Sequence, residues 1–273
     1  MAVGTFDGVH LGHRRVLEAA RATGAGFTAT VVTFEPHPRI ALGYEVELLT
    51  TLERRLELIA ELGIEEALVL EFDLELAQLG ADEFAETVLR PLGTEVVLAG
   101  ANFRFGRARA GNLALLRRLG FDARSVPLVE GVSSSRIRDL IRAGEIERAA
   151  KLLGRPPELD GTVVAGDARG GTLGFPTANL RLDPRLLVPA FGIYAGAVGE
   201  TCAAISIGTN PHYGGQERRV EAHLIDFEGD LYGRRLVVEV WRRLRDERAF
   251  ESEQELVAQI ARDVEQARVA PRP

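Results

Sequence analysis

Residues 4–13 read Gly4-Thr5-Phe6-Asp7-Gly8-Val9-His10-Leu11-Gly12-His13, and this stretch is the most informative segment in the first half of the chain. It lies between a short strand pattern and a helical pattern over residues 14–21, which is where a parallel sheet places a ligand-binding loop. Glycines let backbone amides approach an anion closely, and a helix N-terminus adds positive potential. His10 and His13 can both donate hydrogen bonds to one phosphate. A Gly-rich turn with incidental histidines explains His-x-Gly-His alone equally well, but the ten-residue string favours a phosphate site.

The rest of the first half alternates short β-rich runs with helical patterns. Buried strands are predicted at residues 27–34, 67–72 and 96–99, and amphipathic helices at 52–62, 84–89 and 113–119. Strand–helix alternation of this kind predicts a parallel sheet covered by helices. Two further short helices are predicted near residues 134–142 and 145–153.

The pattern changes after Gly154-Arg155-Pro156-Pro157, because proline cannot continue a helix. Short strands are predicted at residues 161–165, 193–198, 203–207, 220–227 and 236–241, with a hairpin turn at 228–230. Only residues 252–268 return to helical spacing. The second half is therefore predicted to be an all-β barrel or sandwich with one C-terminal helix. We place the domain boundary between residues 155 and 156.

Composition excludes several classes of protein. The 273 residues are 46% hydrophobic and 27% charged, with a net charge of −7, as in ordinary soluble globular proteins. Lys151 is the only lysine and is followed by leucine, so a P-loop is excluded. The single Cys202 excludes a disulfide framework and a cysteine zinc cluster. The sequence has no run of 18 apolar residues and no signal-like N-terminus, which predicts a cytoplasmic location.

Charge is distributed unevenly along the chain. Residues 45–95 carry 14 acidic and 3 basic side chains, which we interpret as a solvated surface. Residues 99–148 carry 10 arginines and 5 acidic side chains among glycines and serines, which indicates an anion site. Nucleic acid is an unfavourable partner, because the acidic protein as a whole would repel it.

A second phosphate-binding pattern is Ser133-Ser134-Ser135-Arg136-Ile137-Arg138, at the predicted start of a helix. Helix N-capping alone explains one of the serines. Three hydroxyls, free amides and guanidinium groups can together hold a pyrophosphate. With the first stretch it predicts the two halves of one nucleotide site.

These motifs resemble the adenylyltransferase module of bacterial bifunctional riboflavin kinase/FAD synthetases, a Rossmann-like domain of the HxGH nucleotidyltransferase group. Residues 33–38 (TFEPHP) and 100–106 (GANFRFG) match that module too, although a loop and core phenylalanines would explain each in isolation. The resemblance implies that His10, His13 and Arg136 stabilise charge at the α-phosphate and the departing pyrophosphate. It implies ATP contacts from Gly4, Phe6, Asp7, Gly8, Gly12, Ser133, Ser134, Ser135 and Arg138. It implies flavin contacts from His37, Pro38, Asn102 and Phe103.

The second half opens on a glycine-rich segment, residues 161–174, followed by Phe175-Pro176-Thr177-Ala178-Asn179-Leu180. The glycines fit tight turns and barrel corners as well as a cradle for ATP phosphates. Thr177 and Asn179 are two residues apart, so on an extended chain their neutral oxygen ligands share a face. Such ligands suit Mg²⁺ when phosphates complete its shell.

The resemblance continues here with the PTAN motif of riboflavin kinases, with residues 207–211 (IGTNP) and with residues 220–224 (VEAHL). It implies that Glu221 is the general base for the ribityl 5′-hydroxyl; without the motif an exposed strand carboxylate would be the better interpretation. It implies ATP contacts from Gly161, Gly166, Asp167, Arg169, Gly174 and Pro176, and flavin contacts from Asn210, Arg245 and Phe250. The five histidines all lie in or beside these motifs, but their spacing does not match a zinc site.

The resemblance covers residues 2 to about 268 and implies two consecutive reactions: riboflavin and Mg·ATP give FMN, and FMN and a second ATP give FAD and pyrophosphate. The alternatives are transfer to another phosphate-bearing acceptor, a monofunctional riboflavin kinase with an inactive first half, and a flavin-binding module without catalysis. The presence of both His10 and His13 argues against an inactive first half. The presence of Glu221, Thr177 and Asn179 argues against a flavin-binding module, because such a module needs neither a base nor a Mg²⁺ site.

The sequence departs from the family pattern in three places. Gly171 stands where an arginine is usual, and Ser135 replaces the more usual threonine. The chain also begins only three residues before Gly4. Either the start codon is misassigned or the central strand of the sheet is shortened. We expect a longer native protein, and a weakened adenylyltransferase half in the 273-residue chain.

Overall fold

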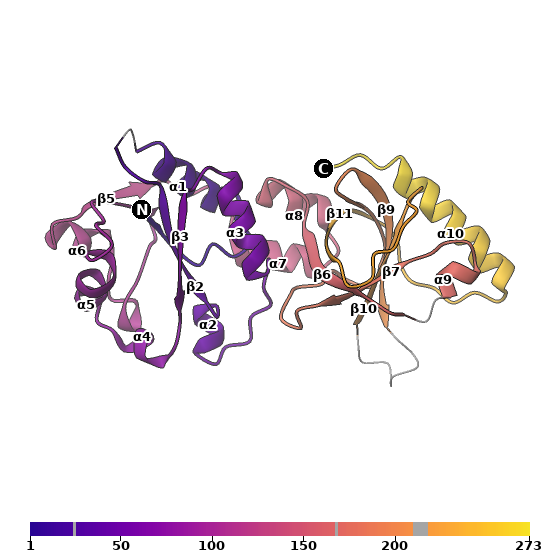
Figure 1. Ribbon diagram of the computed structural model, residues 1–273, viewed down its shortest axis with the longest axis horizontal. Coiled ribbons are helices and arrows are strands. Elements are labelled where there is room, and N and C mark those ends of the chain that lie inside the picture. The colour runs from indigo at the N-terminus through magenta and orange to yellow at the C-terminus, as the bar shows by residue number, and fades with distance from the viewer. Residues whose placement is uncertain (24–25, 167–168, 210–217) are drawn as a thin grey trace. The chain divides into compact units, whose positions relative to one another are not determined.

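The computed structural model describes residues 1–23, 26–166, 169–209 and 218–273. The chain forms two compact units, shown in Figure 1. The first, the α/β unit, comprises residues 1–46 and 52–133, and the second, the barrel unit, comprises residues 47–51 and 134–273. None of the helices in these described stretches is long and apolar enough to cross a membrane.

The α/β unit is built on a five-stranded sheet in the order β3-β2-β1-β4-β5. Its strands are β1 (Ala2–Val3), β2 (Thr30–Glu35), β3 (Glu66–Glu71), β4 (Val96–Gly100) and β5 (Asp122–Val126). Every pair of neighbouring strands is parallel, so the predicted parallel sheet is confirmed. The short strand β1 lies in the middle, between β2 and β4. The crevice of such a sheet opens where the strand order reverses, which here is beside the carboxyl end of β1.

Helices cover both faces of this sheet. They are α1 (Leu11–Arg21), α2 (Pro38–Ala41), α3 (Leu52–Glu61), α4 (Leu74–Gln78), α5 (Ala81–Phe84), the π-helical turn η1 (Ala85–Leu89), the 3₁₀ turn η2 (Arg107–Arg109) and α6 (Leu113–Arg118). Because side chains alternate along a strand, Ala2 joins the core under α1 and α3 while Val3 joins the core under α5, η1 and α6.

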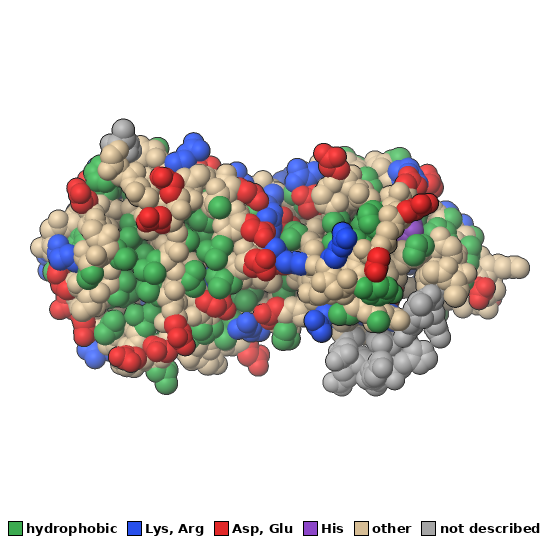
Figure 2. Space-filling view, in the orientation of Figure 1, with side chains coloured by type: hydrophobic (Ala, Val, Ile, Leu, Met, Phe, Trp, Pro, Cys, Tyr) green, Lys and Arg blue, Asp and Glu red, His purple; other side chains and the backbone are tan. Residues whose placement is uncertain are grey.

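The acidic stretch of residues 45–95 lies on the surface. All of its acidic side chains except those of Glu47 and Glu57 are exposed. Figure 2 shows acidic side chains spread over the visible face of the α/β unit, among apolar and neutral ones.

The barrel unit is a closed six-stranded barrel with the order β10-β7-β6-β11-β8-β9, all neighbours antiparallel. Its strands are β6 (Glu158–Val164), β7 (Ala178–Leu182), β8 (Gly192–Val198), β9 (Thr201–Thr209), β10 (Arg218–Leu224) and β11 (Arg235–Arg245). Its helices are α7 (Ser134–Arg142), α8 (Ile146–Leu153), α9 (Arg169–Thr172) and α10 (Glu253–Arg268). Of the two predicted architectures, the structure confirms the barrel with a C-terminal helix and not the sandwich.

Helices α7 and α8 belong to the barrel unit by packing. Ile146 of α8 is fully buried in the barrel core, and α8 packs against β11. The boundary between the two compact units therefore lies between residues 133 and 134, upstream of the proline-containing segment 154–157. The boundary between residues 155 and 156, drawn for the two activities, stays a prediction.

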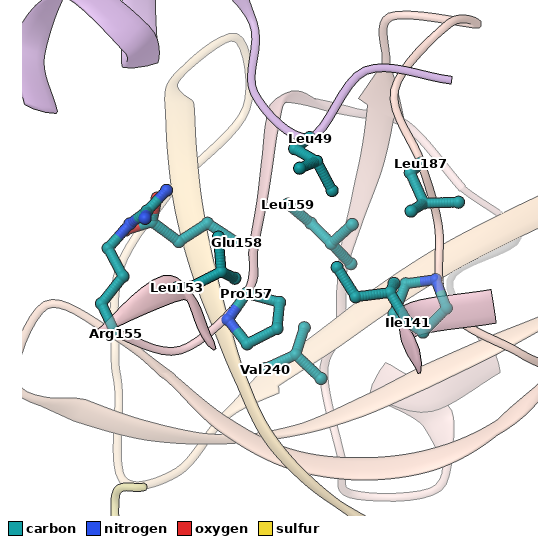
Figure 3. Close-up of a pocket in the computed structure, with 10 residues that line it drawn as sticks. Leu49, Ile141, Leu153, Arg155, Pro157, Glu158, Leu159, Leu187 and Val240 are labelled. Carbon is teal, nitrogen blue, oxygen red and sulfur yellow. The ribbon is translucent and has the colours of Figure 1, made fainter. Parts of the chain in front are cut away.

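The segment 47–51 also packs into the barrel unit, although it lies between two stretches of the α/β unit in sequence. Leu48 pairs with Leu186, its N–H donating to the Arg185 carbonyl at 2.7 Å. Leu49 is buried in a core cluster with apolar side chains of α7 and α8. Figure 3 shows Leu49 facing Leu159 across a cavity of about 10 Å³, which is room for a single water at most. This cavity is a packing gap and not a substrate pocket.

Leu49→Ala is expected to destabilise the barrel unit by about 2–5 kcal/mol, because it deletes a buried side chain from a well-packed cluster. Trp241 is the only tryptophan and lies on β11, so its fluorescence during denaturant unfolding reports the barrel unit. Leu42→Ala is the control, since Leu42 is 49% exposed. An unfolding midpoint for Leu49→Ala equal to that of the control would contradict the packing of residues 47–51.

Candidate active sites

Three predicted motifs meet at one edge of the α/β sheet. The stretch 4–13 follows β1, residues 36–38 follow β2, and residues 101–106 follow β4. Because the carboxyl ends of parallel strands lie at the same edge, these loops surround the crevice beside β1. The arrangement brings the predicted phosphate loop and the predicted flavin loops of this unit together.

The loop after β1 is held in an unusual backbone conformation. The Gly4 N–H donates to the Val32 carbonyl at 3.0 Å, which extends the pairing of β1 with β2. Phe6 and Val9 then take positive φ angles of +49° and +39°, uncommon for bulky residues. Both side chains are only 2% exposed, so core packing holds the strained loop. Strain of this kind concentrates at functional sites.

His10 and His13 stack on each other at the N-terminus of α1. Their ring centroids are 3.6 Å apart with an interplanar angle of 13°. His10 is the N-cap, and its Nδ1 accepts a hydrogen bond from the His13 backbone N–H at 3.3 Å. Because Nδ1 accepts this hydrogen bond, Nε2 is the ring nitrogen of His10 that can donate. The geometry suits the predicted role of both histidines as donors to phosphate oxygens.

The flavin positions predicted in this unit differ in their surroundings. His37 caps α2 through its Nδ1, which accepts from the Arg39 N–H at 3.1 Å, and Pro38 follows as the first helical residue. Asn102 is exposed. Phe103 stacks on the buried Phe105 with centroids 5.4 Å apart. The Phe103 ring is thus held in place by Phe105. The capping hydrogen bond is sufficient to explain a histidine at position 37. All four flavin contacts stay predictions.

The serine–arginine motif lies mostly in the barrel unit, since Ser133 is the last residue of the α/β unit and α7 starts at Ser134. Arg136 is exposed, but Arg138 is 7% exposed and its Nε donates to the Glu47 carbonyl at 2.6 Å. Arg138 thus fastens the segment 47–51. That Arg136 acts together with His10 and His13 stays a prediction, as do the ATP contacts of Ser135 and Arg138.

In the barrel unit the structure brings Thr177, Asn179 and Glu221 together. Glu221 of β10 is the register partner of Asn179 on β7, and the Thr177 hydroxyl donates to Glu221 Oε2 at 3.1 Å. The neighbouring Ala222 is fully buried, so Glu221 points outward from the barrel. His223 lies on the same face, its Nδ1 2.7 Å from the Pro176 carbonyl oxygen.

Arg219 completes this cluster, although no sequence motif pointed to it. Its Nε donates to Asn179 Oδ1 at 2.8 Å and lies 2.5 Å from Glu221 Oε1. Arg219 and Glu221 are two residues apart on a strand, so they share a face. The alternation along β10 could have pointed to Arg219, but its contact with Asn179 depends on strand pairing.

The glycine segment passes directly over these side chains. A Cβ at Gly166 would overlap the Asn179 amide, and one at Gly170 would overlap the Phe175 carbonyl and lie 3.2 Å from Thr177 Oγ1. At Gly161 a Cβ would meet the Arg181 carbonyl at 2.8 Å, so strand packing explains that glycine. Gly171 has open space around it, which leaves room for the arginine usual in the family. Asp167, Asn210 and the side chain of Arg169 lie outside what the structure describes.

The predicted flavin contacts Arg245 and Phe250 lie near α10. Arg245 is paired with the buried Asp263, with Nη2 2.7 Å from Oδ2, and its guanidinium lies 5.8 Å from the centre of the Phe250 ring. Burial raises the pKa of Glu247, and a Cβ at Gly208 would overlap its carboxylate. Gly208 belongs to residues 207–211, but the atoms that a Cβ would meet are the end of a flexible side chain, so packing alone does not require glycine there.

Each unit therefore has its own set of residues predicted to bind nucleotide phosphates, which is the arrangement expected of a transferase with two nucleotide-dependent centres on one chain. An FAD synthetase family model matches residues 1–137, and a riboflavin kinase model matches residues 153–270. The chain belongs to the family of bifunctional riboflavin kinases/FMN adenylyltransferases.

Individual relatives agree over nearly the whole chain. The bifunctional riboflavin kinase/FMN adenylyltransferase of Listeria monocytogenes is 35% identical, over 98% of this chain and 91% of its own length. That of Escherichia coli K12 is 37% identical, over 96% and 90%. A solved structure described as a macrolide-efflux protein from Streptococcus pneumoniae has a TM-score of 0.86 and 34% identity, covering 99% of this chain and 94% of that one.

Proposed function

We propose that this chain converts riboflavin to FMN in the barrel unit and FMN to FAD in a site built on the α/β unit, using ATP in both steps. The observation that carries the proposal is the cluster of Thr177, Asn179 and Glu221 on the outer face of the barrel. The similarity to bifunctional relatives along the whole chain supports both activities and does not favour the monofunctional kinase. We assign the adenylyltransferase to residues 1–155 and the kinase to residues 156–273.

In the kinase step Glu221 accepts the proton of the riboflavin 5′-hydroxyl as that oxygen bonds to the γ-phosphorus of ATP. The bond from the γ-phosphorus to the bridging oxygen breaks, and ADP leaves. Such transfer depends on alignment and on neutralising charge. Thr177 and Asn179 would hold a Mg²⁺ ion, which supplies that neutralisation. Their neutral oxygens both border the Glu221 carboxylate, Thr177 through its hydrogen bond and Asn179 as the register partner, and such a mixed oxygen donor set fits Mg²⁺.

In the adenylyl step a phosphate oxygen of FMN bonds to the α-phosphorus of ATP, and pyrophosphate leaves. His10 and His13 donate to the oxygens that gain charge, and Arg136 adds a positive charge. No covalent enzyme intermediate is needed. The remaining ATP and flavin contacts are assigned to the residues predicted from the sequence, and the cytoplasm remains the predicted location.

One incubation tests the proposal: the chain with riboflavin, Mg²⁺ and ATP, followed by chromatographic separation of FMN from FAD. FAD formation supports both activities, and FMN alone would support only the kinase. A chain that converts neither flavin would refute the proposal. Substituting other phosphate-bearing acceptors for FMN tests the choice of acceptor.

Arg219→Met is expected to lower kcat for FMN formation about tenfold and to lower the Mg²⁺ concentration for half-maximal rate. The guanidinium orients Glu221, and hydrogen bonds to charged groups contribute about 1.5–3 kcal/mol. The Arg219 guanidinium also donates a hydrogen bond to Asn179 Oδ1, and its positive charge repels a cation at that oxygen. Mg²⁺ titration of the kinase rate measures both effects.

Arg218→Met is the matched control, because the neighbouring Arg218 donates to the Val188 carbonyl instead. An Arg219→Met chain with the kcat and Mg²⁺ dependence of this control would contradict the role assigned to Arg219.

A further inference from the structure

Arg55 in the first turn of α3 is the largest fully buried side chain of the α/β unit, with 1% of the residue exposed. A buried guanidinium is unfavourable by several kcal/mol unless it is well paired. Arg55 Nη1 donates to the Thr5 carbonyl at 3.0 Å, and Nη2 donates to the Phe34 carbonyl at 3.2 Å and to Glu35 Oε2 at 2.9 Å. Its partners are therefore mainly backbone groups of other elements.

These partners lie in one of the loops that surround the crevice and at the end of the strand that leads into another. Thr5 belongs to the stretch 4–13, while Phe34 and Glu35 end β2 and lead into residues 36–38. The Thr5 carbonyl also accepts from the buried Thr33 hydroxyl at 3.1 Å, so two donors fix one carbonyl. A planar guanidinium fork can serve acceptors on two strands at once, which a lysine ammonium does less well.

Fixing the Thr5 carbonyl fixes the loop that follows it. The peptide unit is planar, so this carbonyl also sets the direction of the Phe6 N–H. Phe6 then takes its positive φ, and the chain runs through Val9 to the N-cap His10. A displacement of this peptide would be carried into the loop amides and the histidine pair.

We infer that Arg55 is a positioning residue for FMN adenylylation. It holds the predicted phosphate loop, residues 4–13, and the predicted flavin loop after β2, residues 36–38, at a fixed separation without touching either substrate. The inference rests on the proposed adenylyltransferase activity. A misplacement of about 1 Å can lower a rate 10²-fold, which is the scale of effect that a lost anchor would produce.

The test measures kcat for FAD formation from supplied FMN and kcat for FMN formation from riboflavin on the same full-length preparations. Arg55→Met should lower the first about 10²-fold and leave the second unchanged. Arg55→Lys should recover about tenfold of the loss, since an ammonium can still reach one carbonyl. Arg54→Met is the matched control and should stay within about twofold of the unchanged chain, because Arg54 pairs with Glu57 and Glu61 on its own helix.

A second variant separates positioning from folding. Thr33→Val keeps the side-chain shape and leaves Arg55 in place, but removes one of the two donors to the Thr5 carbonyl; it should lower kcat for FAD about three- to tenfold. Amide hydrogen exchange in β2 and β4 reports whether the α/β unit is folded. If Arg55→Met does not fold, Thr33→Val with an unchanged kcat overturns the inference.

If the Arg55→Met and Arg55→Lys variants fold and make FAD at the unchanged rate, the role of Arg55 is overturned, while the proposed adenylyltransferase activity stands. An unsubstituted chain that makes FMN but no FAD overturns the proposed adenylyltransferase activity, and the inference with it. These two failures are distinguished by the first measurement, on the unsubstituted chain.

Discussion

Glu221→Gln is expected to lower kcat for FMN formation by about 10²–10⁴-fold, the range that a positioned general base contributes. Glutamine keeps the length and shape of the side chain, and its amide oxygen can still accept from Thr177. It cannot accept the proton of the 5′-hydroxyl. The KM values for riboflavin and ATP should change little, because the amide oxygen can still accept a hydrogen bond from the riboflavin 5′-hydroxyl. FAD formation from supplied FMN should stay unchanged, because Glu221 belongs to the barrel unit.

Two controls make this prediction sharper. Glu228→Gln removes the same charge at an exposed turn of the barrel unit and should leave both rates unchanged. Glu221→Asp keeps a base but withdraws it by one methylene, so its kcat should lie between those of the unchanged chain and Glu221→Gln. If Glu221→Gln retained the FMN rate, the cluster with Thr177 and Asn179 would not be the kinase centre.

The sequence predicted the features that depend on local pattern. Strand–helix alternation predicted the parallel sheet, and the short strands after the prolines predicted an all-β barrel or sandwich. The spacing of Thr177 and Asn179 predicted that they share a face, and the family resemblance implied that Glu221 acts in the same reaction. The register of Glu221 with Asn179 brings the three side chains together. The predicted strand ends were less accurate. Strand β10 stops at Leu224, ahead of the predicted end at residue 227, and Asp226 takes a φ of +58° that leaves extended geometry.

Features that depend on non-local packing could not be predicted. Closure of the barrel rests on pairing of β10 with both β7 and β9, which no local pattern reveals. Leu49 looks like an ordinary apolar residue before a helix, yet it packs in the other unit. The sequence marks Arg55 only weakly, as one of three basic residues in the acidic stretch 45–95. Its burial and its two carbonyl partners depend on how α3 packs on the sheet, which the sequence does not show.

His13→Ala is expected to lower kcat for FAD formation from supplied FMN by about 10²–10³-fold, the effect of removing one donor from a charge-stabilising site. The His13 ring stacks on His10 and meets the Phe6 ring edge-on with centroids 5.3 Å apart, so it is held in place before substrates bind. His13 gives a clearer test than His10, whose side chain also caps α1 and whose loss would weaken the helix by about 1 kcal/mol.

The kinase step should be unaffected by His13→Ala, so a chain given riboflavin and ATP should accumulate FMN in place of FAD. Arg15→Ala is the control on the same helix, because Arg15 is exposed and should leave FAD formation unchanged. Loss of both FMN and FAD formation in a folded His13→Ala chain would mean that the two reactions do not have separate sites, and would overturn the assignment of adenylylation to the α/β unit.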